Sequence, residues 1–196
     1  MLKTAGLMQK AGFLDKSRDL VVELMENLGE QKLASIKVEA LTLLGSFHYF
    51  KNELPLALKY YQEAIEEGEK TGQKIQYWRP YFLVGNTYFY KSEYNLSIPY
   101  FSKALELIPA NEKDNYAMVL GLRLYSYYFL GKITDGEPDK EELEKNMVFI
   151  ENPIILSHIY HSLALCYNWQ GQHAKGLEYS LMASALGEKA GYAIAI

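Results

Sequence analysis

Few residues of this chain are of types that could carry out chemistry. His158 and His161 lie three positions apart, a spacing that places both on one face of a helix. A zinc ion needs further ligands, and no cysteine pair or nearby carboxylate completes such a set. Cys166 stands between Leu165 and Tyr167, a setting typical of a buried small apolar residue rather than a reactive thiol. We therefore expect surface histidines and an inert cysteine.

The acidic run from Asp135 to Glu144 is the other candidate for metal binding. It lacks the alternating ligand spacing of a calcium loop, and carboxylates in the first turn of a helix are favoured by the helix dipole. The sequence also has no glycine-rich phosphate loop and no nucleophile elbow. These observations predict that the chain is not an enzyme and binds no metal and no cofactor.

Charge and cysteine content limit the classes of partner that the chain is expected to bind. The 196 residues carry 20 basic and 24 acidic side chains, a net charge of −4, so no basic excess is present to bind a nucleic acid backbone directly. Charged residues such as Lys3, Lys10 and Asp15 interrupt the first segment, which excludes a signal peptide or a membrane span there. With a single cysteine, the chain is expected to be cytoplasmic and to have no membrane partner.

The sequence repeats itself with a period of about 40 residues. The strings at 68–72 and 187–191 are near-copies that lie 119 positions apart. Small residues recur at Gly45, Gly85 and Ala164, each preceded by a bulky residue and followed three positions later by His48, Tyr88 or Tyr167. Further small and aromatic residues follow at matching offsets: Ala57, Tyr61 and Ala64; Ser97, Phe101 and Ala104; Gly176 and Ala183. Small residues at such positions allow two antiparallel helices to cross closely.

This pattern resembles the tetratricopeptide repeat, in lengthened units of about 40 residues. The resemblance implies an all-α fold, a right-handed superhelix or α-solenoid of antiparallel helix pairs, and covers nearly the whole chain. It implies one array with repeats at 1–37, 38–77, 78–116, 117–156 and 157–196.

The fourth repeat is irregular, and the C-terminus is abrupt. Arg123 replaces the apolar residue before the small position, and Leu124 fills the small position itself. We expect the second helix of this repeat to begin near Asp139, after a turn at 135–138, and to run through Leu143, Met147 and Ile150 to Asn152-Pro153. Because residues 192–196 fall inside what would be the next helix, the chain is expected to be a piece of a longer protein.

The resemblance also implies a binding groove lined by the first helix of each repeat. The matching positions combine aromatic and polar side chains, which suits an extended or helical peptide. They are Glu39, Thr42, Ser46, Tyr49, Arg79, Phe82, Asn86, Phe89, Tyr125, Tyr128, His158, His161 and Asn168, with Met118, Gly121 and Leu165 on the same face. Some of these aromatics are alternatively expected to pack between neighbouring repeats.

Lengthened repeats of this kind are similar to those of bacterial sensory and regulatory proteins and of eukaryotic adaptors. The resemblance therefore implies a domain that binds a protein or peptide, within a regulatory or scaffolding protein for signalling or transcription regulation. Two alternatives stay open. One is a homo-oligomerisation module that self-associates through exposed ends, and the other is an auxiliary domain of a signalling enzyme.

Overall fold

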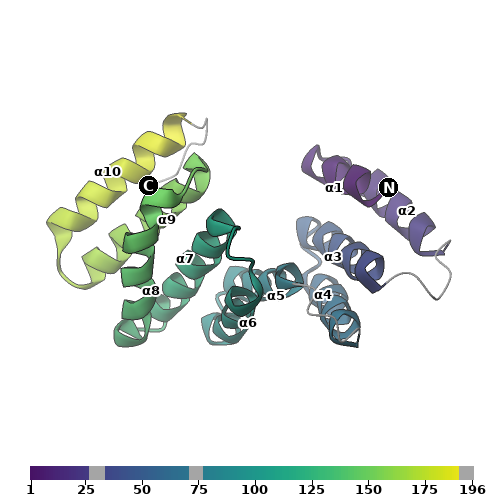
Figure 1. Cartoon of the computed structure of the whole chain (residues 1–196), viewed down its shortest axis with the longest axis horizontal. Coiled ribbons are helices and arrows are strands. Elements are labelled where there is room, and N and C mark those ends of the chain that lie inside the picture. Colours follow the sequence, from purple (N-terminus) through teal and green to yellow (C-terminus); the bar gives the residue numbers. More distant parts are fainter. Residues whose placement is uncertain (27–33, 71–76, 190–196) are drawn as a thin grey trace. The chain divides into compact units, whose positions relative to one another are not determined.

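The structure is a computed structural model that describes residues 1–26, 34–70 and 77–189. Within these residues the fold is all-α, with no strand, as the sequence predicts. The chain forms two compact units, residues Met1–Thr87 and Tyr88–Ile196. The elements are α1 (Leu2–Lys10), α2 (Leu14–Glu26), α3 (Ala34–Phe50), α4 (Leu54–Lys70), α5 (Trp78–Tyr90), α6 (Tyr94–Leu107), α7 (Lys113–Phe129), α8 (Ile133–Asn146), the 3₁₀ turn η1 (Met147–Phe149), α9 (Pro153–Trp169) and α10 (His173–Lys189) (Figure 1).

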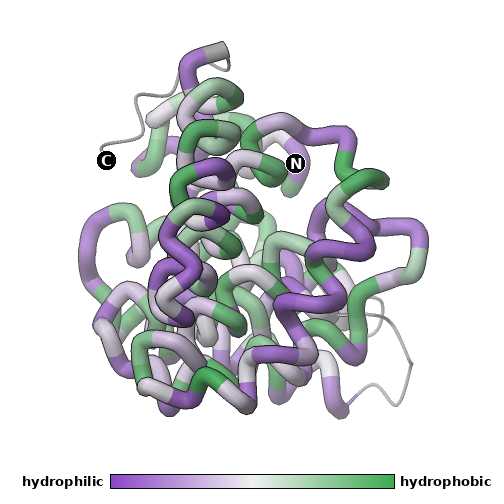
Figure 2. The backbone as a smooth tube through the Cα atoms, turned by 90° about the vertical axis from the view of Figure 1, so that its left-hand side faces the viewer, coloured by the Kyte–Doolittle hydropathy of each residue, from purple (hydrophilic) through white to green (hydrophobic). Residues whose placement is uncertain are grey.

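Neighbouring helices pack as pairs within each unit. Unit 1 holds the pairs α1/α2 and α3/α4, and unit 2 holds α7/α8 and α9/α10 (Figure 1). Helix α5 spans the boundary between the units. Hydrophobic and hydrophilic residues alternate along the helical tube in Figure 2, as expected of helices that bury one face.

One type of turn recurs along the chain. A residue with positive φ lies in each of the loops α1–α2, α3–α4, α5–α6, α7–α8 and α9–α10, and these residues are Gly12, Asn52, Ser92, Gly131 and Gly171. The turn closes with a backbone hydrogen bond back into the helix, such as the one from Glu53 N to His48 O at 2.9 Å. This left-handed stop reverses the chain within three residues, so the second helix runs back along the first. The sequence itself predicts these turns, because polar strings at 51–53, 91–93 and 170–172 separate apolar stretches and Gly131 follows at the same offset; the structure confirms them.

The core of unit 1 shows why the crossing position must be small. A Cβ atom at Gly45 would lie 2.5 Å from the ring of Tyr61, whose side chain is fully buried. Ala57 and Ala64, on the same face of α4 as Tyr61, are also fully buried. The predicted helix crossing is therefore confirmed for this pair.

The second helix of the fourth repeat differs from the prediction. Helix α8 begins at Ile133 rather than near Asp139, so the expected turn at 135–138 lies inside the helix. The turn is set instead by Gly131, at the same place as in the other pairs. Pro138 is the sixth residue of α8, as Pro99 is of α6, and both are exposed.

The end of α8 is also earlier than predicted. Helix α8 stops at Asn146 and η1 follows, while Ile150 has extended backbone angles. At the helix crossing, Gly136 takes the position of Ala57, Ser97 and Gly176, a match that the sequence comparison missed. A Cβ there would lie 3.1 Å from Leu124.

Some sequence predictions lie outside the described residues. They concern Gly72, Gly191 and the segment 192–196. In the part of the chain that is described, no helix has the length and apolar character needed to cross a membrane.

Candidate binding surface

Unit 2 carries a contiguous group of aromatic rings, which we call the aromatic surface: Phe89, Tyr94, Tyr125, Phe129 and His161. The ring of Phe129 stacks on Tyr94, with centroids 4.7 Å apart and planes 12° apart, and on Tyr125 at 5.9 Å. Phe89 meets Tyr94 edge-on at 5.3 Å and Tyr125 at 6.1 Å. His161 extends the group at 6.0 Å from Tyr125. Such offset and edge-to-face contacts hold the rings in fixed orientations.

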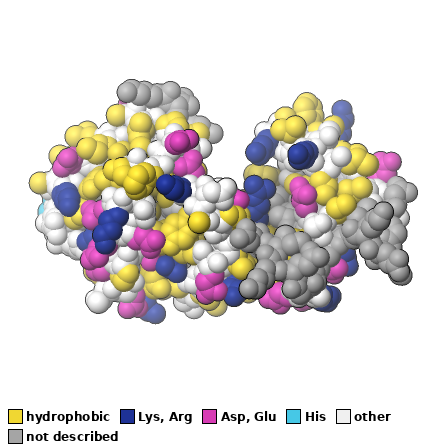
Figure 3. Space-filling model, in the orientation of Figure 1, with side chains coloured by type: hydrophobic (Ala, Val, Ile, Leu, Met, Phe, Trp, Pro, Cys, Tyr) yellow, Lys and Arg dark blue, Asp and Glu magenta, His cyan; other side chains and the backbone are white. Residues whose placement is uncertain are grey.

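Four helices position these rings. Phe89 is the penultimate residue of α5 and Tyr94 is the first residue of α6. Tyr125 and Phe129 lie one turn apart on α7, and His161 lies on α9. The i, i+4 spacing puts the two α7 rings on one face. Phe129 is 49% exposed, whereas the other members are partly buried. The partly buried rings therefore hold the surface in place, and Phe129 presents it to solvent. Figure 3 shows hydrophobic side chains gathered on the face of this unit that it displays.

The polar atoms of the aromatic surface are uncharged at neutral pH. Burial, together with the nearby His158, lowers the pKa of His161. Burial also raises the pKa of the Tyr125 hydroxyl, although a hydrogen bond with Ser162 acts in the opposite direction. The surface therefore offers ring faces, the hydroxyls of Tyr94 and Tyr125 and one neutral imidazole, and it is suited to non-covalent contact rather than to bond making.

The predicted residues of unit 1 have mixed environments. Glu39 and Arg79 are exposed, and Arg79 lies over the ring of Trp78 at 5.6 Å. The Asn86 amide donates to the Tyr49 hydroxyl at 3.3 Å, so these two predicted residues are brought together.

Three further predicted residues of unit 1 are held by their own helices. The hydroxyls of Thr42 and Ser46 donate to the carbonyls of Val38 and Thr42, at 2.6 and 2.9 Å. Phe82 contacts the ring of Trp78 at 6.0 Å.

The remaining predicted residues of unit 2 separate into exposed and buried positions. His158 and Asn168 are exposed, and the Asn168 side chain lies against Gly176 of α10. Tyr128 is only 2% exposed, and its hydroxyl donates to Glu137 at 3.3 Å and accepts from Gln170 at 3.2 Å. It is therefore an inter-helix contact and not part of the aromatic surface, which is the alternative role noted for these aromatics.

The residues considered for chemistry have structural surroundings. Cys166 is 1% exposed, and burial raises its pKa to about 12, so the thiol is not a nucleophile at neutral pH. Within residues 1–26, 34–70 and 77–189, no three His, Cys, Asp or Glu side chains are grouped as metal ligands would be.

Sequence reasoning missed one recurring feature of the first helices. An aromatic residue ends the helix in four pairs, and each is largely exposed: Phe50 at 61%, Tyr90 at 64%, Phe129 at 49% and Trp169 at 56%. The sequence could have revealed this feature, because these aromatic residues recur with the period of the repeat. Each directly follows a predicted groove position: Tyr49, Phe89, Tyr128 or Asn168. Tyr94 was missed because it lies on a second helix.

Comparison with known families supports the repeat assignment. Residues 79–111 match the family model described as tetratricopeptide repeat. This segment contains a tetratricopeptide repeat. The matched segment covers α5 and α6, which contribute Phe89 and Tyr94 to the aromatic surface.

Solved structures share the fold of this repeat protein at low sequence identity. BtubC (BKLC) from P. vanneervenii is 17% identical, with a TM-score of 0.79 over 98% of this chain and 80% of that one. MamA of MSR-1 is 15% identical, with a TM-score of 0.62 over 96% and 95% of the two chains. A Rap protein complexed with competence and sporulation factor is 16% identical, with a TM-score of 0.69 over 89% of this chain and 48% of that one, so this chain spans about half of the Rap protein. No curated protein matches by sequence.

Proposed function

We propose that this repeat protein binds a peptide or protein segment on the aromatic surface of unit 2. The observation that carries the proposal is the ring cluster of Phe89, Tyr94, Tyr125 and Phe129, which is fixed by mutual stacking and open at Phe129. Rigid aromatic side chains supply a large contact area and lose little rotamer entropy on binding, and such residues dominate measured interface energies.

The chemistry of the surface favours an uncharged, partly apolar segment. His161 is neutral at pH 7, and no ion pair or charged side chain belongs to the ring cluster as defined. The His161 imidazole can then orient a backbone amide of the ligand. Exposed Asn168 and His158, which lie on α9 with His161, extend this proposed surface.

The proposal extends to the residues of unit 1 that match groove positions. Glu39, Arg79 and the hydrogen-bonded pair Tyr49 and Asn86 are proposed as further ligand contacts, within one array of five repeats. The Rap protein with its bound competence and sporulation factor has the same fold, which favours a regulatory or scaffolding role in signalling or transcription regulation. We propose that this role is carried out in the cytoplasm, without catalysis by this chain.

A peptide-display selection on the whole chain tests the proposal, followed by calorimetric titration of the selected peptides. We expect Phe129→Ala to weaken binding by about 2 kcal/mol, roughly thirtyfold, because it removes the exposed ring of the cluster. Phe13→Ala is the matched control, since Phe13 is 56% exposed in unit 1. Equal losses for the two variants, or no loss for Phe129→Ala, would refute the proposed site.

Helix α10 supports a second candidate function, self-association. Leu177 and Leu181 lie one helical turn apart and are 60% and 63% exposed, so they form an apolar stripe that a second copy could cover. We expect a concentration-dependent dimer in analytical ultracentrifugation that Leu177→Glu with Leu181→Glu abolishes. A wild-type monomer at high concentration would exclude this candidate.

A further inference from the structure

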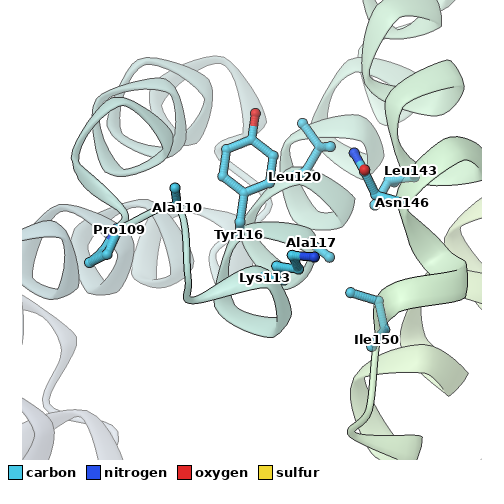
Figure 4. A pocket seen from close by; sticks show the side chains of 9 residues that line it. All are labelled: Pro109, Ala110, Lys113, Tyr116, Ala117, Leu120, Leu143, Asn146 and Ile150. Carbon is cyan, nitrogen blue, oxygen red and sulfur yellow. The ribbon is translucent and has the colours of Figure 1, made fainter.

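Unit 2 contains a pocket of about 240 Å³ away from the ring cluster. It lies between the α6–α7 loop, the first turns of α7 and the end of α8 (Figure 4). Its walls are apolar. Leu120 and Leu143 are at most 1% exposed, Ala117 is 2% exposed and Ile150 is 9% exposed. None of these residues was predicted as part of a binding site.

The pocket has a cause in the sequence of the fourth repeat. Ala117 takes the position of Val38 in the second repeat, so the wall of the fourth repeat is two methyl groups smaller. Asn146 takes the position of Glu67, which in the second repeat forms an ion pair with Lys37 at 2.8 Å. In the fifth repeat the same position is Leu186. The fourth repeat thus combines a small wall residue with an amide at the end of α8.

Two polar side chains at the pocket are unused by the fold. Among the described residues, neither the Asn146 amide nor the Lys113 ammonium has a hydrogen-bond or ion-pair partner. The Lys113 ammonium instead lies over the ring of Phe149, 4.5 Å from its centroid. Asparagine offers one acceptor and two donors, which match the C=O and N–H groups of a peptide backbone.

Two carboxylates beside the pocket determine which ligand charge it favours. Asp114 accepts from the Glu151 backbone at 3.2 Å, and Glu142 accepts from the Tyr116 hydroxyl at 2.9 Å. Asp114 follows Lys113 in the sequence and Tyr116 lines the pocket, so both carboxylates place negative charge beside the pocket and disfavour an anionic ligand. A neutral backbone group is therefore the better partner for Lys113 and Asn146.

The size of the pocket and its surroundings favour a protein segment over a small molecule. Small-molecule sites usually measure about 300–1,000 Å³, and this pocket of about 240 Å³ is smaller. Val148 and Phe149 of the adjoining η1 are 73% and 55% exposed, so apolar surface continues beyond the pocket mouth. A small pocket beside exposed apolar residues suits a partner segment that inserts one side chain into the pocket and lays its neighbouring residues across η1.

We propose that this pocket is a second recognition site, which takes one aliphatic side chain of an uncharged partner segment. Asn146 binds the backbone of the inserted residue, and Lys113 donates to a neighbouring carbonyl oxygen. The site is independent of the aromatic surface, and it would give the array a contact on each of two separate faces of α7.

The probe is a capped peptide of two glycines, one leucine and two glycines, compared with the same peptide carrying alanine. We expect saturable shifts of the Leu120, Leu143 and Ile150 methyl resonances with the leucine peptide only. Asn146→Leu, which copies Leu186, should weaken binding about tenfold through loss of the backbone hydrogen bonds. Ala117→Val, which copies Val38, should abolish binding by filling the pocket.

Phe129→Ala is the control, because it should leave binding of this peptide unchanged whether or not the aromatic surface binds a ligand. Equal shifts with the leucine and alanine peptides would overturn the proposal, as would unchanged affinity in Asn146→Leu. Absence of saturable shifts at the three methyl groups would also overturn it. Circular dichroism of each variant checks that the helices remain folded.

Discussion

Arg123 and Asp139 form an ion pair where the neighbouring repeats have apolar and aromatic residues. Two guanidinium nitrogens of Arg123 donate to the Asp139 carboxylate at 2.8 and 2.6 Å, and a third donates to Ser102 at 2.9 Å. Asp139 is 4% exposed. The pair takes the positions of Leu163 and Tyr179 in the fifth repeat. A buried pair of this kind stabilises the fold little by itself, but removal of one partner leaves a buried charge.

We therefore expect Arg123→Leu to lower the free energy of unfolding by about 3 kcal/mol. The double variant Arg123→Leu with Asp139→Tyr, which copies the fifth repeat, should recover most of that loss. Urea unfolding of the wild type, Arg123→Leu, Asp139→Tyr and the double variant measures the coupling. Additive losses in the double variant would show that the two side chains do not act as a pair.

His161 gives the fold a predicted pH dependence. Burial and His158 lower its pKa below the ordinary 6.5 in the folded state, so the unfolded chain binds a proton first as the pH falls. This residue stabilises the fold fully above pH 6.5, and its contribution is lost as the pH falls from 6.5 through the folded-state pKa. Tyr125, at 6.0 Å, is the ring that faces it.

His161→Phe, which copies Phe82 at the same repeat position, should remove this contribution. The measurement is the difference in free energy of unfolding between wild type and variant at about pH 5 and about pH 7.5. We expect the wild type to lose more stability than the variant at the lower pH. Parallel losses in both proteins would contradict the assignment.

At the scale of the elements, the turns are the most regular feature of the chain. The left-handed position is occupied by glycine at 12, 131 and 171, but by Asn52 and Ser92, each at φ 60°, in the α3–α4 and α5–α6 turns. This backbone conformation costs a residue other than glycine roughly 1 kcal/mol, and the cost is smaller for asparagine. The α5–α6 turn is therefore less favourable than it could be.

A reciprocal exchange tests this cost. Ser92→Gly should raise the free energy of unfolding by roughly 1 kcal/mol, and Gly131→Ser should lower it by a similar amount. Thermal unfolding of each variant gives the comparison. The same sign of change in both variants would mean that backbone conformation does not set the stability of these turns.

The repeat phase predicted the elements better than local composition did. Turn positions and the crossing of Gly45 over Tyr61 follow from spacing, and both agree with the structure. The start of α8 was predicted wrongly because Asp135, Gly136 and Pro138 were interpreted as a turn. Their phase within the repeat places them in the first turns of a helix, where carboxylates are favoured and a proline is tolerated on the exposed side.

The candidate site was only partly predictable from the sequence. The family offsets located Phe89, Tyr125 and His161, because one helix face is enough to identify them. They also included Tyr128, whose burial depends on Glu137 and on Gln170, a residue 42 positions away. The pocket at Ala117 and Asn146 was not predicted, since it arises from a helix that ends early, before η1.

At the scale of the whole molecule, the two proposed binding sites use different residues of α7. Tyr125 and Phe129 belong to the aromatic surface, whereas Ala117 and Leu120 belong to the pocket. Helix α7 can contribute to both sites because it packs on α8 and on α9, which also carry residues of the two sites. The account therefore requires that a ligand of the aromatic surface contact Phe129 and not the pocket.

Photo-crosslinking tests that requirement most directly. Phe129 is replaced by p-benzoylphenylalanine in one protein, Phe149 beside the pocket in a second and Phe13 in a third, and each is irradiated with a display-selected peptide bound. These three aromatic side chains are 49%, 55% and 56% exposed, so accessibility is matched. The account predicts a covalent peptide adduct from position 129 and none from positions 13 and 149. An adduct from position 13 or 149 with none from position 129 would contradict it.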